Sequence, residues 1–373
     1  MPKTLKNVFS QISSMENLEL AYRNAIRNKR YTYGSLQFTS NLIDNLVGIH
    51  SRLRVGTYTP GPFREKLIHD PKTRLIMVQP FEDRVIHWAF YQVINPFLVK
   101  GYIKDSYACI EERGQIAAVE QLQKWMYSAA IQENIDGRPW YYLKMDISKF
   151  FYRVPHDKLM AEVSRKVSDR CVQQWVWAQL EDTPQRFGLP PGKDILEVPR
   201  EERLADRGMP IGTLLSQMLA NMYMNQLDQY AKRTLGMRYY MRYNDDFIVL
   251  LDDKKKLHDI GRCLTAFVTE QLGLEVNPKK TAIRPIRLGV EFCGRKIYAT
   301  HYRLRKSTSL QMKRNLKGVM KRYHYGDLTL EQAAQRVNSY QALLDKGHNE
   351  RLRQSVFGDK NGADGWFVLT REE

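Results

Sequence analysis

The sequence predicts an α+β protein of two or three subdomains, and three observations lead to this prediction. A chain of 373 residues is longer than one compact core usually holds. Helical spacing of apolar residues dominates the first 60 positions, where Leu18, Ala21 and Ala25 fall on one helical face. Strongly β-prone segments at residues 238–243 and 247–251 flank a short polar turn, as in a hairpin.

The charge balance favours a polyanionic partner. The chain has 58 Lys and Arg residues against 41 Asp and Glu residues, a formal net charge of +17. Such an excess attracts nucleic acid, but a solvated basic face without any ligand would give the same total. Charge alone therefore leaves both interpretations open.

Several enzyme and compartment classes lack their sequence signatures. The four cysteines are far apart and form no Cys-x-x-Cys pair, which argues against a zinc ribbon or a disulfide framework. No apolar run reaches the roughly 18 residues of a membrane span, and the first residues lack the apolar core of a signal peptide. We therefore expect a cytoplasmic protein that makes no membrane contact.

Turn-forming residues end the first helical region and open a hairpin. Residues 55–62, with two prolines and two glycines, interrupt the helical pattern. Residues 66–69 and 75–78 then read as strands on either side of Asp-Pro-Lys-Thr. The pattern predicts a hairpin with a basic tip that carries Lys72 and Arg74.

Three carboxylates stand at predicted strand ends. A strand at residues 141–145 leads into Asp146, and Asp245 and Asp246 lie in the turn of the later hairpin. Charges held about 4 Å apart would repel by roughly 4 kcal/mol per pair at an effective dielectric constant of 20, so we expect a cation between them. Hard oxygen ligands select Mg²⁺, and two such ions clamp the attacking and leaving oxygens of phosphoryl transfer. Considered alone, two aspartates in an exposed turn are more often mere surface decoration.

Residues 243–246, Tyr-Asn-Asp-Asp, resemble the Tyr-x-Asp-Asp box of reverse transcriptases, and Asp146 matches the first catalytic aspartate of that family. The resemblance implies that Asp146, Asp245 and Asp246 are catalytic and that, together with Ile147, they hold two Mg²⁺ ions. It also implies that the primer 3′-hydroxyl attacks the α-phosphate of a deoxynucleotide and releases pyrophosphate.

The same resemblance implies a nucleotide site. Phe151, five residues after Asp146, occupies the steric-gate position, where an aromatic ring would crowd a 2′-hydroxyl; core packing of Phe150 and Phe151 is the alternative. Lys72 and Arg74 correspond to a fingers hairpin that closes over the triphosphate, although a basic tip is usually only a solvated turn. The residues expected at the nucleotide are Lys72, Arg74, Lys149, Phe150, Phe151, Ile211, Gly212, Gln217 and Lys280.

The segment 208–217, Gly-Met-Pro-Ile-Gly-Thr-Leu-Leu-Ser-Gln, matches the template-and-nucleotide motif of the family. Ile211 stands where most such enzymes have Gln, and Gln217 stands where they have Pro. This version is similar to that of diversity-generating retroelements, whose enzymes copy a template RNA with errors at adenines. Loss of a polar contact beside the nascent base pair would lower discrimination by about 1–3 kcal/mol, neutral drift being the alternative.

The last third of the chain is expected to hold primer and template. Residues 290–294 match the primer-grip turn, where Cys293 replaces Leu and is expected to stay buried. Fourteen Lys or Arg residues and a single acidic one lie between residues 279 and 322, as in a thumb lying along a duplex. The residues expected at primer or template are Tyr243, Asn244, Phe292, Gly294, Lys313, Arg314 and Lys317.

A thumb helix is predicted after Thr329. Thr329 and Gln332 have the spacing of a capping box. The apolar positions of the helix, expected to pack the thumb core, are Leu330, Ala334, Val337 and Leu344.

The resemblance implies a right-hand polymerase architecture. Fingers are expected at residues 1–85 and 156–207, a ferredoxin-like palm at 86–155 and 208–300, and a helical thumb at 301–373. Implied partners are a template-repeat RNA, the RNA/cDNA duplex, deoxynucleotides and a pentameric accessory variability protein, in a bacterial or phage-encoded system. Another stand-alone bacterial enzyme (a retron, intron-maturase-like or phage-defence reverse transcriptase) and an inactive RNA-binding scaffold remain alternatives.

Overall fold

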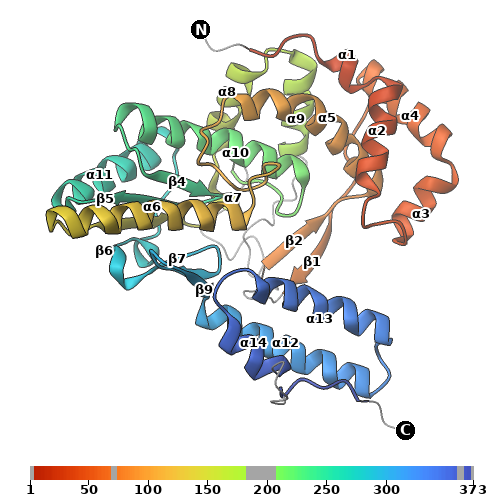
Figure 1. Cartoon of the computed structure of the whole chain (residues 1–373). Helices are drawn as coiled ribbons and strands as arrows, with labels where there is room; N and C mark the ends of the chain where they lie inside the picture. Colours follow the sequence, from red (N-terminus) through yellow and green to blue (C-terminus); the bar gives the residue numbers. More distant parts are fainter. Residues whose placement is uncertain (1–3, 69–73, 182–206, 359–364, 371–373) are drawn as a thin grey trace, which may run out of the picture. The chain divides into compact units, whose positions relative to one another are not determined.

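The computed structural model describes residues 4–68, 74–181, 207–358 and 365–370 (Figure 1). The chain divides into two compact units, each built from separated segments. The first unit comprises Met1–Ile110, Lys144–Phe247 and Asp259–Thr281, and the second comprises Glu111–Leu143, Ile248–His258 and Ala282–Glu373.

The N-terminal region is helical, as predicted. Ser14 begins the second helix by accepting a hydrogen bond from the Asn17 amide, and Gly56 ends the fourth in the left-handed conformation at φ 72°. Leu18, Ala21 and Ala25 are buried, and they lie on the helix that packs most extensively against α5. The helices are α1 (Phe9–Ile12), α2 (Met15–Ala25), α3 (Tyr33–Ser40), α4 (Leu42–Val55) and α5 (Phe81–Lys100).

The predicted hairpin is confirmed. Strands β1 (Arg64–Ile68) and β2 (Arg74–Val78) pair antiparallel, with Lys66 opposite Ile76. The hairpin tip, and Lys72 with it, lies outside the described residues, as does the side chain of Arg74.

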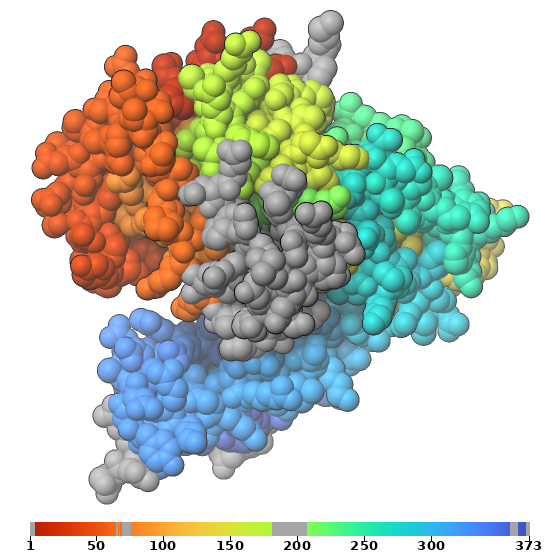
Figure 2. All heavy atoms as spheres, turned by 180° about the vertical axis from the view of Figure 1, so that it is seen from behind, coloured from red at the N-terminus to blue at the C-terminus, as the bar shows by residue number. Residues whose placement is uncertain are grey.

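Segments far apart in sequence meet in the first unit. Leu5 forms a parallel bridge with Val167, and the Phe9 amide donates to Asp169 Oδ2 at 3.0 Å, so the start of the chain lies beside the connection between α8 and α9 (Figures 1 and 2). Helix α10 lies at the centre, because buried residues occur on all its sides. The further elements of this region are α7 (Phe150–Arg153), α8 (His156–Lys166), α9 (Arg170–Glu181), α10 (Leu214–Gln229) and the π-helical turn η3 (Tyr230–Thr234).

A four-stranded sheet has the strand order β4-β5-β3-β6. Strand β3 (Tyr141–Asp146) ends on the predicted carboxylate. Strands β4 (Tyr240–Tyr243) and β5 (Asp246–Leu251) form the second predicted hairpin, so Asp246 is the first strand residue rather than part of the turn. The remaining elements that complete this region are β6 (Ala282–Pro285), α11 (Lys254–Ala266), η4 (Phe267–Gln271) and η5 (Pro278–Lys280).

The second unit carries α6 (Gln115–Asp136) and a three-stranded antiparallel sheet. Its strands β7, β8 and β9 are connected by short turns, and β8 contacts α6. Three helices follow at the C-terminal end of the chain (Figure 1). The bounds are η6 (Ile286–Leu288), β7 (Val290–Phe292), β8 (Arg295–Ile297), β9 (Tyr302–Leu304), α12 (Lys306–His324), α13 (Leu330–Asp345) and α14 (Glu350–Phe357).

The C-terminal helices enclose their own apolar core. The capping box at Thr329 is confirmed: its hydroxyl accepts from the Gln332 amide at 3.2 Å, and Gln332 accepts from the Thr329 amide at 3.2 Å. The expected core position of Leu330 is wrong, because this first helical residue is 59% exposed and Ala333 is buried instead. The core residues are Leu304, Met312, Leu316, Val319, Leu328, Ala333, Val337, Leu344 and Val356.

Within the described residues, no helix is both long enough and apolar enough to cross a lipid bilayer.

Candidate active site

Asp146 and the Tyr243–Asp246 turn are held together by backbone hydrogen bonds. The Ile147 amide donates to the Asp245 carbonyl oxygen at 3.2 Å, directly after β3. Asn244 adopts the left-handed conformation, φ 53°, which lets two residues connect β4 to β5. Asp245 and Asp246 are half-buried, whereas Asp146 is buried. The sequence prediction that these three carboxylates meet is therefore consistent with the geometry.

Asp146 also accepts bonds from the segment at residues 275–280. Its carbonyl oxygen accepts from the Asn277 amide at 2.7 Å, and its Oδ1 accepts from Asn277 Nδ2 at 3.4 Å. Its Oδ2 lies 2.6 Å from Lys280 Nζ. Lys280, which the resemblance places near the triphosphate, thus forms an ion pair with the first carboxylate.

Asp246 has one carboxylate oxygen without a hydrogen-bond donor among the described residues. Its Oδ1 is buried and accepts no hydrogen bond from the described residues, and the closest cation, Lys144 Nζ, is 3.9 Å away. Burial raises the pKa of Asp246 to about 6, the charges of Asp245 and Asp146 add to the rise, and Lys144 opposes it. A buried carboxylate oxygen beside two further carboxylates is the donor chemistry that a hard divalent cation requires.

The described residues contain no group of three acidic, His or Cys side chains already arranged as a complete metal site. One oxygen of Asp146 is paired with the Lys280 ammonium group at 2.6 Å. Ile147, expected to share in metal binding, is only 1% exposed. Its side chain has no ligand atom, so only its backbone carbonyl oxygen would serve. The carboxylate oxygens of Asp146, Asp245 and Asp246 are the type of donor that suits a hard divalent ion, and metal binding by them remains a prediction.

The predicted steric gate lies shortly after β3. Lys149 is exposed and left-handed at φ 48°, and it precedes the short helix that carries the two phenylalanines. Phe150 is 3% exposed, whereas Phe151 is half-buried and meets the Phe150 ring edge-on at a centroid distance of 5.2 Å. Phe150 therefore belongs to the core, whereas Phe151 remains partly exposed.

Backbone bonds join the gate to the segment at residues 208–217. The Met209 amide donates to the Phe151 carbonyl oxygen at 2.7 Å. Gly208, φ 98°, packs so closely that a Cβ atom would lie 3.3 Å from this oxygen. These two motifs, almost 60 residues apart in sequence, therefore form one structure.

The same segment is also fastened to the hairpin strand β2. The Ile211 carbonyl oxygen accepts from the Met77 amide at 3.0 Å, and the Ile211 side chain is half-buried. Gly212 has φ 108°, and a Cβ atom there would lie 2.8 Å from Ile76 Cγ2. Gln217 lies in the first turn of α10, where its amide donates to the Thr213 carbonyl oxygen at 3.4 Å, a bond that Pro could not make.

The predicted primer-grip turn is a two-residue hairpin between β7 and β8. Cys293 and Gly294 both have positive φ, 47° and 73°, as in a type I′ turn. Phe292 is buried, and the Gly294 carbonyl oxygen accepts from the Arg305 amide at 3.0 Å. The expectation that Cys293 is buried is wrong, because a turn residue points away from the sheet and its side chain is only half-buried.

The basic residues expected at the duplex lie on α12. Lys313 lines a surface cavity of about 720 Å³ together with Lys296, Arg305 and Arg351. Arg314 is exposed. Lys317 Nζ lies 5.9 Å from the ring centroid of Trp366, in the C-terminal segment that covers the thumb core. Their contact with nucleic acid remains a prediction.

Sequence reasoning missed two residues that contact the carboxylates. Lys144 could have been found, because alternation along β3 puts it on the same face as Asp146. Asn277 lies three residues before Lys280, and nothing in the sequence spacing indicates its two bonds to Asp146. Tyr243 is half-buried at the end of β4, next to the carboxylate turn, and its contact with a primer remains a prediction.

Comparison with known proteins identifies the family. The model for "Reverse transcriptase (RNA-dependent DNA polymerase)" matches residues 68–297, more than half of the chain. The chain belongs to this family. Its fold is accordingly that of a right-hand polymerase, and no described feature conflicts with the nucleotidyltransferase chemistry of the family.

Individual relatives are distant. Protein YkfC of Escherichia coli is 23% identical over 283 residues, which cover 67% of this chain and 70% of YkfC. A 91 kDa protein in the cob intron of Schizosaccharomyces pombe is 32% identical over 104 residues, 27% of this chain and 11% of that protein. Apo telomerase from Candida tropicalis is 13% identical with a TM-score of 0.50, over 83% of this reverse transcriptase and 60% of the telomerase chain. This last similarity concerns the fold alone.

Asp246→Asn is expected to stabilise the metal-free reverse transcriptase. A carboxyl whose pKa rises from 3.8 to about 6 on folding binds more protons in the folded state, so its contribution to stability falls as pH rises through that range. At pH 7.5 the variant should gain on the order of 1 kcal/mol, allowing for partial exposure and coupling. Urea unfolding in chelator at pH 4, 5, 6 and 7.5 measures the difference, which should be smallest at pH 4.

Asp327→Asn supplies the control, since it removes the same charge from an exposed turn. It should leave the free energy of unfolding unchanged at each pH. An Asp246→Asn variant that is less stable than wild type at pH 7.5 would contradict the burial argument.

Gly212→Ala is expected to destabilise the junction between β2 and the segment at residues 208–217. The new methyl group meets Ile76 at 2.8 Å, and φ 108° is strained for any L-residue, so the cost should exceed about 1 kcal/mol. Chemical denaturation measures this loss of stability.

Gly318→Ala is the matched control, because Gly318 is an exposed position on α12 with open space around it. This variant should gain about 0.5–1 kcal/mol in the free energy of unfolding. Equal changes in the two variants would refute the packing argument.

Proposed function

We propose that this reverse transcriptase makes error-prone cDNA from a template-repeat RNA, with errors concentrated at template adenines. The observation that carries the catalytic part is the convergence of Asp146 with Asp245 and Asp246, where one carboxylate oxygen of Asp246 is buried without a hydrogen-bond donor. The proposed subtype rests on Ile211 and Gln217 in the segment that joins the gate to β2.

The three aspartates would hold two Mg²⁺ ions. When bound, the ions would lower the pKa of the primer 3′-hydroxyl and neutralise charge on the pyrophosphate leaving group. Asp146 orients the site from the end of β3, while the turn presents Asp245 and Asp246 from the adjacent strands. The Lys280 ammonium group lies at Asp146, so it would be close to the bound ions and could contact the triphosphate.

The nucleotide would lie between the gate and the β2 junction. Phe151 exposes part of its ring directly after the catalytic strand, and a ring there would crowd a 2′-hydroxyl. Lys72, Arg74 and Lys149 would contribute positive charge toward the triphosphate. Gly212 lets this segment approach β2 closely, because a Cβ atom there would lie 2.8 Å from Ile76 Cγ2.

Ile211 would be the residue that lowers fidelity. Its backbone position is fixed by the Met77 amide, so its side chain occupies a defined place. An aliphatic side chain cannot form the hydrogen bond that a Gln would offer there, and the missing bond removes about 1–3 kcal/mol of discrimination.

The proposed assembly includes nucleic acid and a protein partner. The primer would contact the Tyr243–Asn244 part of the turn and the hairpin at Phe292–Gly294, and the duplex would contact Lys313, Arg314 and Lys317 on α12. A pentameric accessory variability protein is proposed as partner on the family resemblance. The fingers, palm and thumb boundaries given above belong to the same proposal.

An intron-type reverse transcriptase is the second candidate. One relative is described as a protein in the cob intron, and its 32% identity over 104 residues exceeds the identity to YkfC. An intron-type enzyme would copy its template without bias at adenines. The error spectrum of the cDNA therefore distinguishes the two candidates.

Asp245→Asn is expected to abolish cDNA synthesis. The purified chain, with candidate template RNA, Mg²⁺ and deoxynucleotides, with and without accessory protein, should extend a primer, and the variant should lose about three orders of magnitude or more in rate. Asp327→Asn, on an exposed turn, should retain the wild-type rate. Normal extension by Asp245→Asn would exclude the assigned site.

Ile211→Gln is expected to reduce misincorporation at template adenines by about 5- to 100-fold, since a restored hydrogen bond adds 1–3 kcal/mol of discrimination. Deep sequencing of the cDNA measures errors at each template base. Ile135→Gln makes the same change at a 79% exposed position and should leave the spectrum unchanged. An unaltered spectrum in Ile211→Gln would remove Ile211 from the fidelity mechanism.

A further inference from the structure

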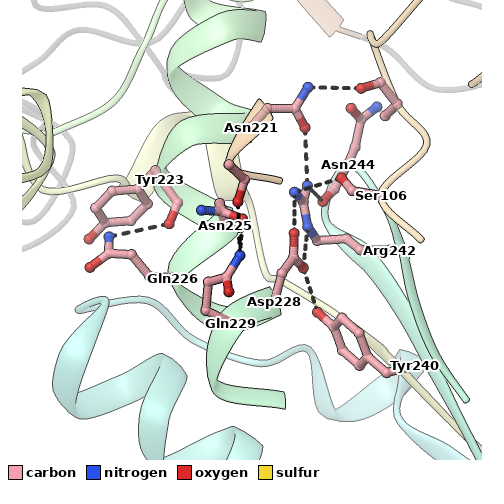
Figure 3. Close-up of polar contacts among 12 residues, drawn as sticks. Ser106, Asn221, Tyr223, Asn225, Gln226, Asp228, Gln229, Tyr240, Arg242 and Asn244 are labelled. Carbon is pink, nitrogen blue, oxygen red and sulfur yellow. Dashed lines mark hydrogen bonds and ion pairs between the residues drawn. The ribbon is translucent and has the colours of Figure 1, made fainter. Parts of the chain in front are cut away.

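A buried arginine lies immediately behind the carboxylate turn. Arg242 is 1% exposed, and each of its five N–H groups has an acceptor (Figure 3). Nε and Nη2 donate to the two oxygens of Asp228, both at 2.8 Å, and Nη2 also donates to Ser106 Oγ at 3.0 Å. Nη1 donates to Asn221 Oδ1 at 3.2 Å and to the Asn244 carbonyl oxygen at 2.9 Å.

The bond to Asn244 reaches the turn itself. Asn244 is the left-handed residue that precedes Asp245, so the direction of its carbonyl group and the path of the turn are coupled. The next carbonyl group, that of Asp245, accepts the bond from Ile147 that brings Asp146 to the turn. The Arg242 side chain therefore bonds to the residue immediately before Asp245, and the Asp245 carbonyl group makes the contact that brings Asp146 to the turn.

The other ligands of the guanidinium are themselves fixed. Asp228 is fully buried on α10 and accepts a second bond from Tyr240 Oη at 2.8 Å. Asn221, about two helical turns earlier on α10, donates to the Ala108 carbonyl oxygen at 2.8 Å. The Arg242 guanidinium group is therefore bound mainly by side chains of the central helix α10.

The segment at residues 105–107 holds the backbone of Arg242 from the other side. The Arg242 amide donates to the Asp105 carbonyl oxygen at 3.0 Å, and its own carbonyl oxygen accepts from the Tyr107 amide at 3.0 Å. Asp105 is in turn paired with Lys232 at 2.7 Å. Both the main chain and the side chain of Arg242 are consequently constrained.

We propose that Arg242 is a positioning residue that, supported by Asp228, sets the conformation of the carboxylate turn for metal binding. This inference rests on the proposed function, and it concerns the residue that orients the carboxylate turn of the proposed active site. A buried ion pair is an inefficient way to stabilise a fold, because desolvation offsets most of the attraction. A planar fork with five donors, by contrast, fixes geometry in a way that apolar packing or a single ammonium group cannot.

Arg242→Lys tests the proposal, since it keeps the charge and removes the fork. The expected results are a fall in primer-extension turnover of about 100-fold, a several-fold higher half-saturating Mg²⁺ concentration and little change in the KM for deoxynucleotide. Two measurements do not depend on activity. The first is calorimetric titration of the protein with Mn²⁺. The second is hydrogen exchange of residues 240–248 in the metal-free protein, which should become faster in the variant.

Tyr240→Phe is the matched control. It removes a bond to the same buried Asp228 carboxylate but makes no contact with the turn. It should lower the melting temperature, as Arg242→Lys does, while the Mg²⁺ midpoint and the exchange of the turn stay at wild-type values. Equal behaviour of the two variants in all assays would show a merely structural role and overturn the proposal.

A variant that fails to fold does not end the test. Asn221→Ala removes the other acceptor of Nη1 and leaves the ion pair with Asp228 intact, so a several-fold rise in the Mg²⁺ midpoint is expected there too. An unchanged midpoint in a folded Asn221→Ala variant would overturn the proposal. If wild-type chain incorporates no nucleotide, the proposed function fails instead, and the Mn²⁺ titration and exchange data still decide the role of Arg242.

Discussion

The repulsion among three carboxylates is the constraint on which the catalytic region depends. Asp146, Asp245 and Asp246 are held near one another in surroundings that raise the pKa of Asp246 to about 6. No isolated turn would keep this arrangement, since each pair of charges favours separation. The surrounding structure supplies the opposing force through Lys144, through Lys280 and through main-chain bonds that cannot be removed by a single side-chain change.

Main-chain bonds also explain how distant motifs of this reverse transcriptase act as one site. The gate is bonded to Met209, the Ile211 carbonyl to β2, and the end of β3 to both the turn and Asn277. Glycines at 208 and 212 allow these approaches, because a Cβ atom at either position would meet a neighbouring element. The backbone thus fixes the positions of these residues independently of their side chains. Ile211 and Gln217 therefore occupy defined positions although their side chains differ from those of most family members.

Much of the fold could be read from local pattern. The helical N-terminus, both hairpins, the strand before Asp146 and the capping box at Thr329 follow from periodicity and turn chemistry. The predicted burial is wrong at two residues whose position at the end of an element exposes them. Leu330 is exposed because it is the first residue of its helix, and Cys293 is half-buried because it occupies a hairpin turn. Lys144 was overlooked although strand alternation placed it beside Asp146.

The sequence by itself determined the family: motif order and residue type indicated a reverse transcriptase and predicted its three carboxylates, its aromatic gate and the unusual Ile-Gly segment. Only the tertiary structure decided what holds them, because the partners come from segments with no spacing relation to the motifs. The contacts of Asn277 with Asp146, of Ser106 with Arg242 and of Met77 with Ile211 each join residues 131 to 136 positions apart. Asp228 and Arg242 are only 14 positions apart, but they lie on different elements. Local propensity carries no information on such pairings, since packing of the whole unit selects them.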